Sequence, residues 1–135
     1  MSRFLLDTNV ISEAIRNPRG LVFKRLRQES GDVCTSIIVV AELRFGLAKN
    51  PSMRLAAQIE RMIHSLSVID FRPPAEAKYG EIRAYLERLG KPIGGNDLWI
   101  AAHALALDAT LITANEREFR RVPGLRVENW TLPQA

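Results

Sequence analysis

Short apolar runs alternate along the chain with longer segments in which apolar residues recur at helical spacing. The apolar runs predict short strands at residues 4–6, 32–35, 67–69, 110–113 and 126–128. The segments between them predict a helical turn at 116–119 and helices at residues 10–16, 21–28, 39–50, 51–64, 75–90 and 97–109. Strands that alternate with helices are typical of an α/β domain built on a mainly parallel sheet.

Local signals support several of these boundaries. Ser36 is a favoured residue type for the N-cap of the helix that follows it. The pair Pro73-Pro74 precedes the long helix and Gly90 ends it, as proline and glycine commonly do at the two ends of a helix.

Length and composition restrict the class of protein. The 135 residues fit one domain, which we expect to span residues 1–135. The lone Cys34 cannot form an intramolecular disulfide, and no run approaches the roughly 20 apolar residues of a membrane span. The apolar run Phe4–Leu6 is too short for a signal peptide. We therefore expect a cytoplasmic protein with no membrane association.

The net charge of +4 favours polyanionic partners without identifying one. Part of this charge lies in one early segment, which contains Arg16, Arg19, Lys24, Arg25 and Arg27. These residues form either a solvated helix face or a patch that faces RNA or a protein partner, and the sequence leaves both interpretations open.

Three acidic residues stand beside apolar segments. Asp7 ends the run FLL, Glu42 lies within VVAELRFG, and Asp97 opens a helix after GGN. Helix capping explains Asp7 and Asp97 as well as a functional role does.

Glu42 is harder to explain by local structure. Its helical neighbours Ile38, Phe45 and Gly46 predict that it faces a largely apolar groove, with space beside Gly46. Because an unpaired buried carboxylate is costly, we expect a positive charge or a metal ion near Glu42.

The predicted sheet brings the three acids to one crevice. Open parallel sheets bind ligands at the carboxyl ends of their strands, where the strand order reverses. Carboxylates about 5 Å apart repel each other by roughly 3 kcal/mol at an effective dielectric of about 20. A divalent cation relieves this repulsion, and oxygen ligands select a hard ion such as Mg²⁺ or Mn²⁺. A hard ion in the acidic crevice of a basic protein indicates phosphodiester hydrolysis.

Four ordered motifs resemble a known family. LLDTNVIS, VVAELRFG, GGNDLWIAAHAL and LITANEREFRRVPGL are similar to motifs of the PIN-domain ribonucleases, specifically the VapC-type toxins of bacterial toxin–antitoxin pairs. The resemblance covers nearly the whole chain. It implies a three-layer α/β/α sandwich with a mainly parallel sheet of about five strands, and a homodimer. It also implies a Mg²⁺- or Mn²⁺-dependent endoribonuclease toxin that cleaves cellular RNA to inhibit translation and growth. A cognate VapB-type antitoxin would neutralise it, and the two proteins would also form larger toxin–antitoxin complexes.

The resemblance assigns roles to particular acids. Matched position by position, the family's first three acids fall on Asp7, Glu42 and Asp97, which are then catalytic residues and metal ligands. The family's usual fourth acid falls on Asn115, where this chain has a neutral amide. Asn115 completes the expected catalytic set, and its lack of charge leaves the number of metal ions open.

Asn115 has other interpretations. Asn115 and Glu118 form a capping-box pattern, and Glu116 is an alternative source of the missing charge. Three further residues either orient the carboxylates and metal-bound waters or serve as caps and strand ends. These are Thr8, Asn9 and Thr113.

Several rival interpretations remain. His103 is a candidate general base, but six helical residues separate it from Asp97, so we expect it to be a packed core residue. The main alternative function is a catalytically silent PIN-like module that binds RNA or a protein. Haloacid-dehalogenase-type phosphatases also use an Asp at a strand end, but they have a second Asp two residues later, where this chain has Asn9. The loop KPIGGND lacks the GxxxxGK spacing of a P-loop.

Overall fold

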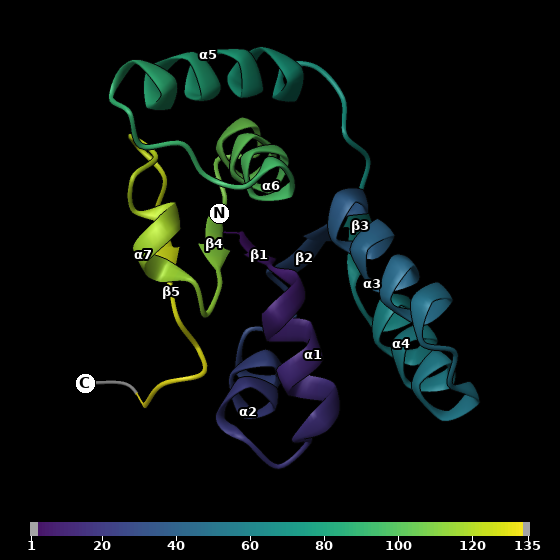
Figure 1. Cartoon of the computed structure of the whole chain (residues 1–135). Helices are drawn as coiled ribbons and strands as arrows, with labels where there is room; N and C mark the ends of the chain where they lie inside the picture. The colour runs from purple at the N-terminus through teal and green to yellow at the C-terminus, as the bar shows by residue number, and fades with distance from the viewer. Residues whose placement is uncertain (1–2, 134–135) are drawn as a thin grey trace.

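The computed structural model describes residues 3–133, so the ends of the expected domain, residues 1–2 and 134–135, lie outside the described residues (Figure 1). Within residues 3–133, five parallel strands form one sheet in the order β3-β2-β1-β4-β5. The strands are β1 (Phe4–Leu6), β2 (Val33–Ser36), β3 (Ser67–Ile69), β4 (Thr110–Ile112) and β5 (Val127–Glu128). The predicted α/β fold with a parallel sheet of about five strands is confirmed, and the strand boundaries differ from the prediction by one residue at most.

Helices cover both faces of this sheet. In Figure 1, α5 and α6 lie on one side, α1 and α2 lie on the other, and α3 and α4 lie beyond the β3 edge. The helices are α1 (Thr8–Arg16), α2 (Leu21–Gln28), α3 (Ile37–Lys49), α4 (Met53–Ser65), α5 (Ala75–Arg88), α6 (Gly95–Ala106) and α7 (Glu116–Phe119). No helix within the described range is long and apolar enough to cross a bilayer.

Four helix starts lie two residues from the positions that the apolar pattern predicts. Polar caps set three of them, because Asp7, Ser36 and Ser52 each accept a hydrogen bond from a backbone N–H of the following first turn. The Ser36 cap that the sequence predicted is confirmed. The four observed starts are Thr8, Ile37, Met53 and Gly95. The early start of α6 places Asp97 inside its first turn.

The central strands and α6 form the middle of the core. Leu5, Leu6, Leu111 and Ile112 are fully buried, as expected for parallel strands that are covered on both faces. The chain leaves β1 toward β2 and β3 and later returns to β4 on the other side of β1. The strand order therefore reverses between β1 and β4, and the ends of these two strands define the crevice in which such sheets bind ligands.

Candidate active site

Asp7 directly follows β1 at this point of the sheet and is almost completely buried. One carboxylate oxygen, Oδ1, accepts a hydrogen bond from the backbone N–H of Thr8 at 2.8 Å. The other, Oδ2, accepts from Thr113 Oγ1 at 2.8 Å and from Asn9 Nδ2 at 3.3 Å. Asp7 therefore caps α1 and also presents a carboxylate whose orientation is fixed by its neighbours, so the two sequence interpretations of Asp7 are compatible.

Asn9 and Thr113 also hold the loop that follows β4. Asn9 Oδ1 accepts from the N–H of Ala114 at 3.0 Å, and Thr113 Oγ1 accepts from the N–H of Asn115 at 3.0 Å. Both residues thus connect the Asp7 carboxylate to the segment that leads into α7. These contacts are those expected of residues that orient a carboxylate from the surrounding shell.

Glu42 faces the site from the middle of α3, but its surroundings differ from the prediction. Its carboxylate accepts from Thr8 Oγ1 at 2.6 Å and from Asn96 Nδ2 at 3.1 Å. Neutral donors therefore contact it in place of a positively charged side chain, and the alternative, a metal ion near Glu42, stays a prediction. The prediction that Glu42 faces an apolar groove is also wrong, because Phe45 is 67% exposed and Gly46 borders open space. The reason is the position of α3 at the edge of the fold, where the Phe45 side of the helix faces solvent.

Asp97 carries the strongest electrostatic signature in the crevice. Burial raises the pKa of Asp97 to about 7, and the charges of Asp7, Glu118 and Glu42 together with a hydrogen bond to Glu118 act in the same direction. Burial also raises the pKa of Asp7, although hydrogen bonds from Thr113 and Thr8 oppose this shift. The acids therefore lie close enough together to repel one another.

Glu118 is the fourth acid of this group, and the sequence analysis did not propose it as a site residue. Its Oε2 accepts from Asn115 Nδ2 at 2.7 Å, and its Oε1 accepts from the backbone N–H of Gly94 at 3.1 Å. These bonds and nearby Arg121 lower the pKa of Glu118, so it stays ionised beside Asp97. Glu116 points elsewhere, to Arg120 and Asn129.

The spacing of residues along α7 contained a signal for this arrangement. Residues three apart share one face of a helix, so Asn115 and Glu118 lie together, whereas Glu116 lies two residues from Glu118 and faces away. Asn115 is the N-cap residue of α7, but its side chain makes no capping bond and contacts Glu118 instead. The capping-box pattern therefore predicted that Asn115 and Glu118 are partners, but their side chains bond to each other and Asn115 makes no side-chain capping bond.

The four carboxylates supply oxygen donors of the type that Mg²⁺ and Mn²⁺ prefer. The charges of the other three acids raise the pKa of Asp97, so negative charge accumulates around this carboxyl and would stabilise a cation beside it. In the described part of the chain, however, no three His, Cys, Asp or Glu side chains stand close enough together to ligate one ion without adjustment. The chemistry of the residues fits a hard divalent ion, and their side chains have to converge to bind it.

Comparison with known proteins identifies the family. Residues 4–125 match the PIN domain. A ribonuclease VapC2 of Haemophilus influenzae is 40% identical over 132 residues, which cover 96% of this chain and 99% of the relative. The chain belongs to the PIN-domain family of VapC ribonucleases.

Two further VapC relatives agree with this assignment. A tRNA(fMet)-specific endonuclease VapC of Shigella flexneri is 38% identical over 133 residues, covering 97% of this chain and all of the relative. The crystal structure of VapBC2 from Rickettsia felis, bound to a DNA fragment from its promoter, contains a chain with a TM-score of 0.89 and 37% identity. That match covers 94% of this chain and 98% of the Rickettsia chain.

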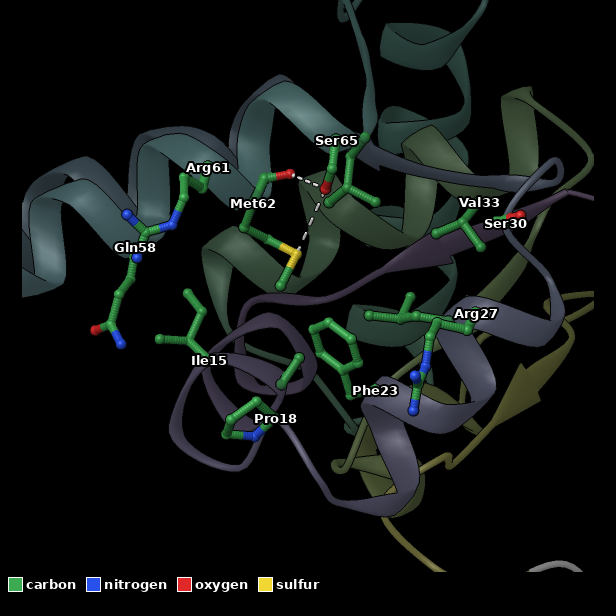
Figure 2. Close-up of a pocket in the computed structure, with 13 residues that line it drawn as sticks. Ile15, Pro18, Phe23, Arg27, Ser30, Val33, Gln58, Arg61, Met62 and Ser65 are labelled. Carbon is green, nitrogen blue, oxygen red and sulfur yellow. Dashed lines mark hydrogen bonds between the residues drawn. The ribbon is translucent and has the colours of Figure 1, made fainter.

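A separate feature of this VapC fold is an apolar pocket between α1, α2 and α4, with a volume of about 560 Å³. Figure 2 shows Ile15 and Phe23 on one side of this pocket and Met62 on the other, with Arg27 and Arg61 among its lining residues. We call it the α1–α2–α4 groove. It does not include any of the four acids, so it is a surface distinct from the crevice.

Proposed function

We propose that this chain, acting as one PIN domain over residues 1–135, is a metal-dependent endoribonuclease toxin. The observation that supports this most directly is the group of four carboxylates, Asp7, Glu42, Asp97 and Glu118, at the point where the strand order reverses. The names of its VapC relatives, ribonuclease and endonuclease, support the same reaction class. The alternative, a catalytically silent module, is disfavoured. Binding RNA or a protein does not require several acids to repel one another in one crevice.

We propose Asp7, Glu42 and Asp97 as ligands of Mg²⁺ or Mn²⁺. When bound, such an ion polarises the scissile phosphate and lowers the pKa of a water. Asp7 contributes a carboxylate that is already oriented by three donors. Asp97 gives up its proton on binding because ligation requires the ionised form, so metal affinity should rise with pH through about 7.

We assign Asn115 a role through Glu118 rather than as a direct ligand. Its side-chain amide donates to Glu118 Oε2, while Glu118 Oε1 accepts a hydrogen bond from the backbone N–H of Gly94. Asn115 therefore holds Glu118 in the crevice, and Glu118 supplies the fourth charge that Asn115 lacks.

For the substrate we propose structured RNA, with initiator tRNA as the first to test. The Shigella relative is named for tRNA(fMet), and the net charge of +4 favours a polyanionic substrate. Such a substrate is met in the cytoplasm, which we propose as the site of action.

We further propose that a VapB-type antitoxin neutralises this chain and that the α1–α2–α4 groove receives an apolar segment of it. The Rickettsia match is to one chain of a VapBC complex. The groove is largely apolar and includes Arg27 and Arg61, so its chemistry fits an apolar segment that also carries acidic residues. A Phe23→Asp variant should lose antitoxin binding and keep its RNA cleavage. Leu21→Asp on the same helix, outside the groove, is the matched control. Equal antitoxin affinity of both variants would place the partner elsewhere.

We also propose a homodimer. Phe45 of α3 and Met53 of α4, 67% and 93% exposed, are apolar side chains that a second copy would cover. Sedimentation analysis of the wild-type chain and of Phe45→Ser tests this proposal, and a monomeric wild-type protein at micromolar concentration would contradict it.

Cleavage itself is tested with purified, antitoxin-free protein and structured RNA. Activity should require Mg²⁺ or Mn²⁺, stop in excess chelator and fall sharply in folded Asp7→Ala, Glu42→Ala and Asp97→Ala variants. Exposed Asp108 provides the control, since Asp108→Asn should cleave at the wild-type rate. Binding of RNA without metal-dependent cleavage would instead support the silent module.

A further inference from the structure

A buried polar contact joins the two helices that carry Glu42 and Asp97. His103 of α6 is 1% exposed, and its Nδ1 lies 2.7 Å from Ser36 Oγ, at the start of α3. Ser36 is itself fully buried. Burying an imidazole and a hydroxyl costs free energy that apolar residues of similar size would not cost. The contact therefore calls for an explanation beyond core packing.

The bonding of Ser36 shows that this contact is anchored on the α3 side. Ser36 Oγ accepts from the backbone N–H of Ile38 at 3.0 Å and so caps the helix. The hydroxyl still has its proton and a second lone pair, so it can bond to His103 Nδ1 with either tautomer of the ring. Burial lowers the pKa of His103, which leaves the ring neutral, while the neighbouring Asp70 opposes this shift. The edge of the ring packs against Phe71, with centroids 5.1 Å apart.

A second contact joins the same two helices nearer the site. Asn96, at the start of α6, donates to Glu42 in the middle of α3 at 3.1 Å. From Ser36 to Glu42 along α3, the contact point on α6 moves back from His103 to Asn96. Glu42 is six positions after Ser36, and His103 is seven positions after Asn96, which at the helical rise amounts to about 9 Å along α3 and about 10.5 Å along α6.

Two contacts spaced this far apart fix what one contact cannot. α3 also packs against β2, β3, α1 and α4, so the two bonds act on its fine position against α6 and not on its overall place in the fold. Bonds at two points roughly 9–10.5 Å apart set both the separation and the relative rotation of the two helices, which one bond alone does not. We propose that His103 is a positioning residue: its bond to Ser36 fixes the register of α3 against α6 and thereby holds Glu42 and Asp97 at the spacing that the acid group needs to bind a divalent ion. This inference rests on the proposed function.

The chain offers well-matched variants for the test. His103→Phe keeps a ring against Phe71 and removes the bonding atom, whereas His103→Asn keeps a polar atom near the position of Nδ1 and loses the ring. Ser36→Ala removes the partner together with the α3 cap. Ser52→Ala is its control, because Ser52 caps α4 through the N–H of Leu55 in an exposed position.

Metal binding is measured by calorimetry with Mn²⁺. Direct partners of metal ligands typically change affinity by 10- to 100-fold. His103 and Ser36 act one step further out, so His103→Phe and Ser36→Ala should each raise the dissociation constant by an amount at the low end of this range, about tenfold. The double variant should show no further loss, His103→Asn should recover most of the affinity, and Ser52→Ala should bind as the wild type does. Unchanged affinity in His103→Phe, or additive losses in the double variant, would overturn the inference. If His103→Phe does not fold, Ser36→Ala against Ser52→Ala decides.

A metal-free measurement separates this inference from the proposed function. The side-chain amide protons of Asn96 report on its bond to Glu42 by NMR. In His103→Phe these signals should move toward those of a free amide, and in Ser52→Ala they should stay in place. Unmoved Asn96 signals in His103→Phe would reject the inference even if the wild type binds Mn²⁺ tightly. A wild type that binds no Mn²⁺, with Asn96 responding as expected, would reject the proposed metal site instead.

Discussion

Neutralising Asp97 should stabilise the metal-free protein while abolishing its activity. The ordinary pKa of this carboxyl is 3.8, and in the folded protein it is raised to about 7. Between these values the folded state binds a proton that the unfolded state has lost, so the free energy of unfolding falls as pH rises through this window and levels off above it. Each pKa unit corresponds to about 1.36 kcal/mol, so the full shift gives an upper limit of about 4 kcal/mol. Because Asp97 is only partly buried, we expect about 2–3 kcal/mol.

The assay is urea unfolding in excess chelator at pH 5 and pH 8. Wild-type protein should lose stability between the two pH values. About two of the roughly three pKa units that separate 3.8 from about 7 lie between pH 5 and pH 7, so Asp97→Asn should lose about 1.5–2 kcal/mol less, which makes it the more stable protein at pH 8. Asp108→Asn makes the same chemical change at a side chain that is 89% exposed and should leave the pH dependence unaltered. An Asp97→Asn variant that is less stable than wild type at pH 8 would refute the electrostatic account of this site.

Three further predictions concern the other residues of the crevice. Glu118→Gln should lose most of the metal-dependent cleavage rate and Glu116→Gln should keep it, as measured on the same RNA; equal rates would remove Glu118 from the site. Mg²⁺ at 100 times its dissociation constant should raise the free energy of unfolding by about 2.7 kcal/mol, and thermal melts of Asp7→Ala should show no such gain. Thr113→Val keeps the shape of the side chain but removes a hydrogen bond to Asp7 and leaves the Asn115 N–H without its acceptor, so urea unfolding should show a loss of about 2 kcal/mol. A loss below about 0.5 kcal/mol would mean that water replaces the hydroxyl.

Much of the fold was predictable because its central strands β1, β2 and β4 are almost wholly buried and therefore read as largely apolar runs. The sequence also indicated Asp7 and Asp97, since an acid directly after such a run, or at the start of an apolar helix, stands out from its neighbours. Glu42 and Glu118 were less easy to interpret. The apolar neighbours of Glu42 indicated a buried groove, but which side of α3 faces solvent depends on where α3 lies relative to the sheet, and periodicity does not contain that information.

Glu118 was missed for a related reason. In the sequence it is one of two acids in a short helix, and only the phase of that helix decides which of them faces the crevice. Glu116 binds Arg120 on its own helix, while Glu118 reaches across to Gly94 at the start of α6. A contact between residues 24 positions apart depends on tertiary packing, which local propensity cannot supply.

The order in which the acids occur along the chain has a consequence for synthesis. The central strand β1 pairs with β4 as its second neighbour, and Glu118 follows β4. Asp7 and Glu42 are therefore made well before the strand and the helix that complete the group of four acids. A polypeptide in which β4 has not yet been made, or has not yet paired with β1, cannot bring these four acids together.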